Sequence, residues 1–346
     1  MDKNIIDALV SSFTWSSRPS LTVTTARERA VSENLIRIEQ VLSTADPLRA
    51  VWSEMPTAAA RRIGGAPATN YVLNRGEPNL TLGFLHRSMA AELARLSGAR
   101  AFPRVWAALG DHGWDETGRP VRAPTLHGTI IPIDFSSPFL NINLCFSDEG
   151  FTEATPNSSA DSARVVQELN SAVALLEQVS AAARDFVLSA TMSIAVHIRP
   201  IPAFSSGSSP ELPGRIDLLN PDHKLADTCH LADSILHEAM HGAMYDLEST
   251  HGAFVANHEH KLLTSPWTGR ELGLHTFIHA CFVWYGLFNF WKLSSCRSSG
   301  ASSFQVTAAS GYAHADPASM VGSTDVPPDI VRAIGEMQRH VRAGLA

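Results

Sequence analysis

One short segment, Leu236-His237-Glu238-Ala239-Met240-His241, constrains this chain more than any other part of its sequence. On an α-helix, residues four apart lie on one face, so His237 and His241 can direct two imidazoles at a single ion. Glu238 is rotated by about 100° from His237 around the helix axis, which suits a general base or a ligand-orienting group better than a direct ligand. The flanking residues are apolar, which predicts a buried helix from about 225 to 247: Leu231, Ile235, Leu236 and Met244.

The sequence alone leaves the third metal ligand open. The metzincin pattern requires a Gly and a His after the second histidine, and the run 242–247 (GAMYDL) lacks both at the required places. A thermolysin-like zinc site takes a Glu farther along the chain, for which Glu259 is the nearest candidate. His275 and His279 are themselves four residues apart in a second predicted helix, about Glu271 to Leu293. One of these two histidines could bind the ion while the other orients a neighbour or faces the core.

The remaining pattern predicts an α+β protein with a mostly helical N-terminal half and a C-terminal strand–helix–helix metal-binding unit that contains the HExxH helix. Apolar periodicity predicts further helices over Ala26–Leu42, Phe84–Leu96, Ala160–Leu188 and Asp329–Leu345. Runs of β-branched and aromatic residues predict strands over Thr125–Phe135, Phe139–Phe146, Ser193–Ile201 and Gly214–Leu219. The Ser-, Ala- and Gly-rich stretch Ser294–Pro328 is expected to be loop or partly disordered.

Two regions are expected along the chain. Residues 1–150 are predicted to form a helical region with some strands, as a scaffold or substrate-binding part, and residues 151–346 the metal-binding catalytic region. The boundary near 150 is approximate, and a single domain is the alternative.

Composition excludes several classes of function. The 346 residues carry a formal net charge of −7 with both signs interspersed, so nucleic-acid binding is not expected. The most apolar stretch, Phe277–Trp291, is shorter than the roughly 20 residues that span a bilayer, and it contains His279 and Asn289. It therefore predicts a buried helix and no membrane partner. The four cysteines are scattered without a CxxC pair, and the first residues lack a signal-peptide pattern, which predicts a reduced, cytoplasmic protein.

An ordered set of motifs resembles a known family, the HExxH-type 2-oxoglutarate-dependent peptide β-hydroxylases found with the biosynthesis of modified peptides. The resemblance covers about 200–295. Its parts are Ser205–Gly214 (SSGSSPELPG) before a strand, the HExxH, the triplet Ser265-Pro266-Trp267, and His279 in an aromatic helix that ends at Phe290-Trp291. The family's spacing selects His279 and not His275. The run after the triplet, Thr268 to Gly273, differs from the family pattern and contains Arg270 as its only basic residue.

This resemblance implies Fe(II) bound by His237, His241 and His279, with 2-oxoglutarate and O₂ as co-substrates and a side-chain β-carbon of a peptide or amino acid as the position hydroxylated. Arginine best matches the distal carboxylate of 2-oxoglutarate, which makes Arg270 the first candidate, ahead of Arg297 and Lys261. Imidazole binds Fe(II) and Zn(II) alike, so a zinc metallopeptidase with Glu238 as general base remains an alternative. A non-catalytic HExxH protein that binds a peptide or a metal is a further alternative. The oligomeric state is left open.

Overall fold

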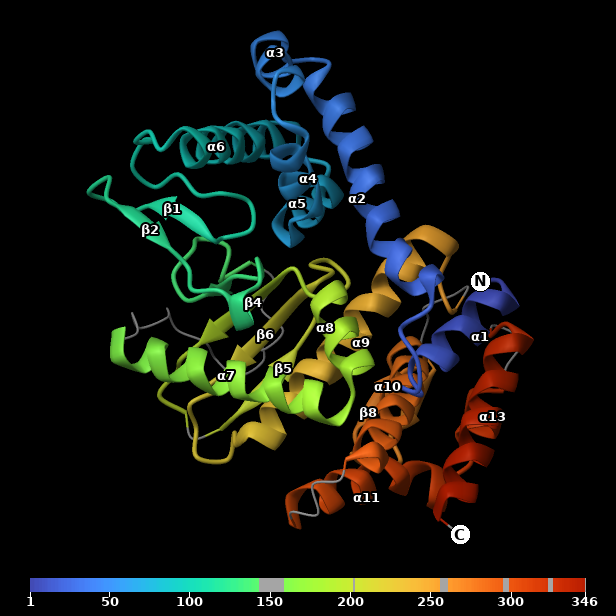
Figure 1. Ribbon diagram of the computed structural model, residues 1–346. Coiled ribbons are helices and arrows are strands. Elements are labelled where there is room, and N and C mark those ends of the chain that lie inside the picture. Colours follow the sequence, from blue (N-terminus) through green and yellow to red (C-terminus); the bar gives the residue numbers. More distant parts are fainter. Residues whose placement is uncertain (143–158, 202, 256–260, 295–298, 323–325, 346) are drawn as a thin grey trace. The chain divides into compact units, whose positions relative to one another are not determined.

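The computed structural model shows an α+β protein that is mostly helical. It describes residues 1–142, 159–201, 203–255, 261–294, 299–322 and 326–345 (Figure 1). The chain forms two compact units, each assembled from separated stretches of sequence. The helical unit, as we call it, comprises residues 1–27, 172–189 and 232–346; the sheet unit comprises residues 28–171 and 190–231. The domain boundary expected near residue 150 lies outside the described residues, so that division stays a prediction.

The sheet unit is built around a four-stranded sheet of order β3-β4-β6-β5. The two longest strands, β4 (Ser193–His197) and β6 (Arg215–Leu219), are parallel and buried along their whole length. The two-residue strand β3 (Ile133–Asp134) extends the sheet in parallel, and β5 (Ser205–Gly207) closes the other edge in the antiparallel direction. A short antiparallel pair, β1 (His112–Trp114) with β2 (Pro120–Arg122), lies outside this sheet.

Helices account for most of the rest of the sheet unit. They are most of α2 (Leu21–Leu42), α3 (Asp46–Ser53), α4 (Thr57–Gly65), α5 (Pro67–Arg75), α6 (Pro78–Ser97) and the first half of α7 (Ser159–Val179). The helices α3, α5 and α6 each have a proline in the first turn, where the missing N–H removes no helical hydrogen bond. The apolar faces of helices α2 to α6 form a core that includes Ile38 of α2, Ile63 of α4 and Leu85 of α6, all fully buried.

The helical unit is formed by long helices and one hairpin. Its elements are α1 (Lys3–Ser12), α8 (Ala181–Ala190), most of α9 (Thr228–His251), the antiparallel strands β7 (Leu262–Thr264) and β8 (Glu271–Gly273), α10 (Leu274–Leu293), α11 (Ser299–His314), α12 (Pro317–Val321) and α13 (Pro328–Leu345). The central element is α10, most of whose side chains are buried. It packs against α11 and α13, and α1 packs against α13. In the described part of the chain, no helix combines the length and apolarity needed to cross a membrane.

Two glycines of the helical unit let side chains approach its helices closely. A Cβ at Gly286 of α10 would collide with the thioether of Met240, which projects from α9. A Cβ at Gly311 of α11 would collide with the indole ring of Trp267. The same indole donates a hydrogen bond of 2.9 Å to the carbonyl of Ala308. Close packing and a hydrogen bond therefore both connect α11 to the Ser-Pro-Trp turn.

Several predicted elements are wrong in extent or kind. The strand expected over Thr125–Phe135 is reduced to β3 and a short 3₁₀ turn, and the one expected over Phe139–Phe146 is absent from 139–142, its remainder being outside the described residues. The expected loop Ser294–Pro328 contains α11 and α12. The small residues of this stretch predicted a loop. The helix forms because one face of α11, which includes Ala308 and Tyr312, is buried against the rest of the unit.

Substitution of Gly311 tests the approach of Trp267 to α11. We expect Gly311→Ala to destabilise the protein by about 1–3 kcal/mol, because the added methyl forces Trp267 or α11 to shift. Gly335→Ala on α13 is the matched control: its Cβ would meet only ordinary contacts at 3.7 and 3.8 Å, so helix propensity should make it neutral or stabilising by up to about 1 kcal/mol. Denaturant unfolding measures both, and equal stabilities for the two variants would contradict the packing described.

Candidate metal centre

The helix α9 carries the HExxH segment in the way the sequence predicts. Its apolar face is fully buried at Leu231, Ile235, Leu236, Met240, Met244 and Leu247. The helix ends at His251, and Gly252 follows with φ of +89°, the left-handed conformation that glycine adopts without strain. The buried face fixes the rotation of the helix, and this rotation determines where its polar stripe points.

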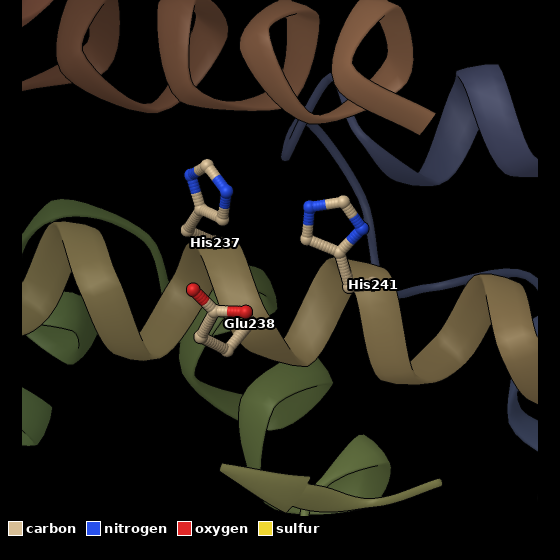
Figure 2. Close-up of side chains that lie close together, drawn as sticks. All are labelled: His237, Glu238 and His241. Atoms are coloured by element: carbon tan, nitrogen blue, oxygen red, sulfur yellow. The ribbon is translucent and has the colours of Figure 1, made fainter. Parts of the chain in front are cut away.

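The three polar residues of the motif lie together on α9. The ligand atoms of His237, Glu238 and His241 all lie within 4.8 Å of one another. The two imidazole rings have centroids 5.1 Å apart, and Figure 2 shows both on the side of α9 that faces α10, while Glu238 projects from another side. Glu238 is only 5% exposed. Two histidines on one face of the helix with a carboxylate beside them are the placement that the spacing predicts.

The second helix of the centre, α10, runs antiparallel to α9. Its residues meet those of α9 in reverse order: His275 contacts Glu248, His279 contacts His241, and Trp284 lies edge-on to His237 at 5.9 Å. The Nδ1 atoms of His241 and His279 are 3.3 Å apart, and the two rings are stacked at 5.5 Å with an interplanar angle of 17°. His279 is fully buried. The structure thus brings His279 against the HExxH helix, as the motif order predicts.

Glu248 is a site residue that the sequence analysis missed. Its side chain is 10% exposed, and its carboxylate faces Nε2 of His275 at 2.9 Å and Nε2 of His279 at 3.0 Å. The backbone N–H of Phe254 also donates to Glu248 Oε1 at 2.9 Å. Glu248, His275 and His279 form a second group whose ligand atoms lie within 4.8 Å of one another. His279 therefore joins the two groups, since it contacts His241 with one ring nitrogen and Glu248 with the other.

Burial disfavours the charged form of two histidines of this centre, His241 and His279. Desolvation lowers the pKa of His241 well below its ordinary value, and the neighbouring His237, His279 and His275 lower that pKa further. Burial also lowers the pKa of His279, against the opposing effect of Glu248. Burial alone would raise the pKa of Glu248, but hydrogen bonds from His275 and His279 outweigh it and hold that pKa below its usual value. These shifts favour the neutral imidazole and the ionised carboxylate, which are the forms that a divalent metal requires.

Aromatic side chains form one wall of the centre. Trp284 packs edge-on against His237, and Trp267 is stacked on Trp284 at 6.0 Å with an interplanar angle of 12°. The Ser-Pro-Trp triplet is the turn of the β7–β8 hairpin: buried Ser265 accepts a hydrogen bond of 2.8 Å from Gly269, which has φ of +70°. The triplet is thus connected to the histidines by stacking, and we find no direct polar contact between them among the described residues.

Arg270, the predicted co-substrate arginine, makes no described contact with either group of histidines and glutamate. Arg270 is exposed at the end of the hairpin turn, where its backbone N–H lies 3.4 Å from Thr268 Oγ1. Within the described part of the chain, its side chain contacts neither the histidines nor Glu248. Of the weaker candidates, Lys261 donates to the carbonyl of Met320 at 2.8 Å, and Arg297 lies outside the described residues, as does Glu259.

Comparison with protein-family models and with curated proteins finds no match to this chain. The likeness to the β-hydroxylases therefore rests on the ordered motifs alone, and what it implies about chemistry is a proposal. The geometry of the histidines does not depend on that likeness, because it follows from the packing of α9 against α10.

Metal binding is the direct test of the three histidines. We expect His237→Ala, His241→Ala and His279→Ala each to abolish binding of Zn(II) or Co(II), or to weaken it severely, because each would remove one of the three predicted ligands. His275→Ala should keep the wild-type stoichiometry. His314→Ala, at an exposed position of α11, is the matched control. Isothermal titration of the apo-protein measures affinity and stoichiometry, and wild-type binding by His279→Ala would remove that residue from the ligand set.

Proposed function

We propose that this protein is an Fe(II)- and 2-oxoglutarate-dependent oxygenase that hydroxylates a side-chain carbon, at the β-position, of a peptide or amino acid. The proposed ligands are His237, His241 and His279. The observation that carries the proposal is the contact of 3.3 Å between the Nδ1 atoms of His241 and His279. It joins the HExxH helix to the one distant histidine that the motif order selects independently.

The facing nitrogens of His241 and His279 fit a divalent transition metal. Two ring nitrogens at this separation suit neighbouring positions on one ion, because metal–imidazole distances are about 2.0–2.1 Å. Desolvation lowers the pKa of both rings, which favours the neutral form that binds metal, and an imidazole set accepts Fe(II) as readily as Zn(II). Three protein ligands leave open positions, which a bidentate 2-oxo acid and dioxygen require.

The chain's own residues supply positioning and a dry environment for this chemistry. Bound Fe(II) would couple oxidation of 2-oxoglutarate to succinate and carbon dioxide with insertion of the second oxygen atom of O₂ into a C–H bond. Trp284 lies edge-on to His237 and Trp267 is stacked on Trp284; these two indoles are proposed to limit the access of water to His237. Glu238, nearly buried beside His237 and His241, is proposed to orient these ligands. Arg270 is proposed to reach the distal carboxylate of 2-oxoglutarate, a role that requires its exposed side chain to turn toward the centre.

A zinc metallopeptidase is the second candidate, and one observation favours it. The carboxylate of Glu238 lies within 4.8 Å of the ligand atoms of His237 and His241, which is where the general base of such an enzyme acts on metal-bound water. The two functions place opposite demands on Glu238. A peptidase needs it to accept a proton, whereas an oxygenase needs it only to orient ligands.

Glu238→Gln separates these two functions. For an oxygenase, we expect this variant to release succinate at saturating Fe(II) with a loss of about 10–100-fold, the usual cost of removing a group that orients metal ligands. The wild type should release succinate only when Fe(II), 2-oxoglutarate and oxygen are all present. Succinate quantified by mass spectrometry, with each component omitted in turn, measures this dependence.

The zinc-loaded wild type is tested in parallel for peptide cleavage. Hydrolysis by this form that is lost in Glu238→Gln would replace the oxygenase by the metallopeptidase. Tight metal binding with neither succinate release nor hydrolysis would leave the non-catalytic metal-binding protein.

Arg270→Ala tests the assignment of the co-substrate carboxylate. We expect the concentration of 2-oxoglutarate at half-maximal rate to rise at least about ten-fold, because a charge-assisted bidentate pair contributes roughly 1.5–3 kcal/mol. Arg339→Ala, at an exposed position of α13, controls for the loss of a surface charge. Initial rates of succinate release against 2-oxoglutarate concentration give both values, and an unchanged requirement in Arg270→Ala would assign the role to another cation.

A further inference from the structure

Glu248 holds a buried carboxylate at the point where α9 and α10 meet. It lies seven residues after His241, two turns along the same face of α9. Four short contacts surround its two oxygens: His275 Nε2 lies 2.9 Å from each oxygen, Phe254 N lies 2.9 Å from Oε1, and His279 Nε2 lies 3.0 Å from Oε2. A carboxylate with this many partners is fixed in orientation, and it can in turn fix the rings that donate to it.

We propose that Glu248 is a positioning residue of the metal centre, which holds His279 as the Nε2–H tautomer and thereby directs its Nδ1 lone pair at the ion held by His237 and His241. This inference rests on the metal centre of the proposed function, although not on the reaction carried out there. It assigns to this chain a carboxylate–histidine–metal relay in which Glu248 contacts the ligand and not the metal.

The tautomer follows from the two neighbours of the His279 ring. A neutral imidazole carries one N–H and one lone pair. The carboxylate of Glu248 can only accept, so the nitrogen that faces it, Nε2, carries the hydrogen. Nδ1 therefore presents its lone pair, and it faces Nδ1 of His241 at 3.3 Å. A metal ion bound by both nitrogens would satisfy both rings at once.

His275 completes the anchor on the other side of the carboxylate. Its Nε2 approaches both oxygens of Glu248, and its ring lies 4.3 Å from that of His279, centroid to centroid. Phe254 adds a backbone donor to Glu248 and an edge-on ring contact of 5.4 Å to His279. These contacts prevent the carboxylate from rotating away, so that removal of His275 alone should loosen the anchor without abolishing it.

A second ion bound by Glu248, His275 and His279 is the competing arrangement. Two histidines and a carboxylate are a recognised ligand set for non-haem iron, and these three donors form a group of the required size. Such an ion would take Nε2 of His279 and leave its Nδ1 protonated against Nδ1 of His241. A neutral His279 ring cannot serve both ions, so the two arrangements predict different nitrogens as the metal ligand.

The nitrogen of His279 that binds metal decides between these arrangements. We expect ring-¹⁵N NMR of histidine-labelled wild type, with His279 assigned through His279→Ala, to show an Nε2–H tautomer in the apo-protein. On addition of one equivalent of Zn(II), Nδ1 should shift as the ligand while Nε2 keeps its proton. Binding through Nε2, or two zinc ions per chain of which one is lost in His275→Ala, would overturn the proposal.

Variants of Glu248 provide the second measurement. Glu248→Gln should weaken Zn(II) binding by about 10–100-fold with stoichiometry kept at one, the usual cost of losing such a partner. His275→Gln should weaken it less, and Glu336→Gln on α13, where the side chain is 46% exposed, should leave it unchanged. Wild-type affinity in Glu248→Gln would refute the role of the carboxylate. Because neither measurement uses 2-oxoglutarate or turnover, failure of the oxygenase assignment would not be mistaken for failure of this inference.

Discussion

The buried contact between His241 and His279 is the interaction on which the candidate site depends. It requires α9 and α10 to run antiparallel in one register, with Glu248 opposite His275 and His237 opposite Trp284. Buried polar groups are costly unless each is paired, so a register that failed to pair them would be strongly disfavoured. The polar residues of α9 thus favour the one register in which they face the histidines of the mostly apolar helix α10. A buried polar residue fixes the register of coiled coils in the same way.

The packing around this contact explains residues that have no direct chemical role. Gly286 leaves room for Met240 of the facing helix, and Gly311 leaves room for the indole of Trp267. Trp267 in turn stacks on Trp284, which lies against His237. The Ser-Pro-Trp turn and α11 are therefore linked mechanically to a histidine of the centre. Such linkage can hold a ligand ring in one orientation before any metal binds, which is the preorganisation that metal sites need.

The sequence predicted the elements whose signals are local. The spacing of His237 and His241 on an apolar helix, and the apolar run of α10, needed only helical periodicity, and both helices are confirmed. Helical periodicity could also have predicted Glu248 as a site residue, because position 248 lies on the same face of α9 as His241, two turns later. The hairpin of β7 and β8 and the helix α11 were not predicted, because three-residue strands lack a period and α11 is stabilised by contacts with distant residues such as Trp267.

The central claim is that one ion is bound by His237, His241 and His279 with open positions for a 2-oxo acid. Anaerobic titration of the apo-protein with Fe(II) and then 2-oxoglutarate, followed by visible absorption, tests it most directly. We expect a charge-transfer band that appears only when both are present, saturates at one equivalent of iron, and is lost in His279→Ala but kept in His275→Ala. Iron binding without such a band in the wild type, or a band that survives in His279→Ala, would contradict the account.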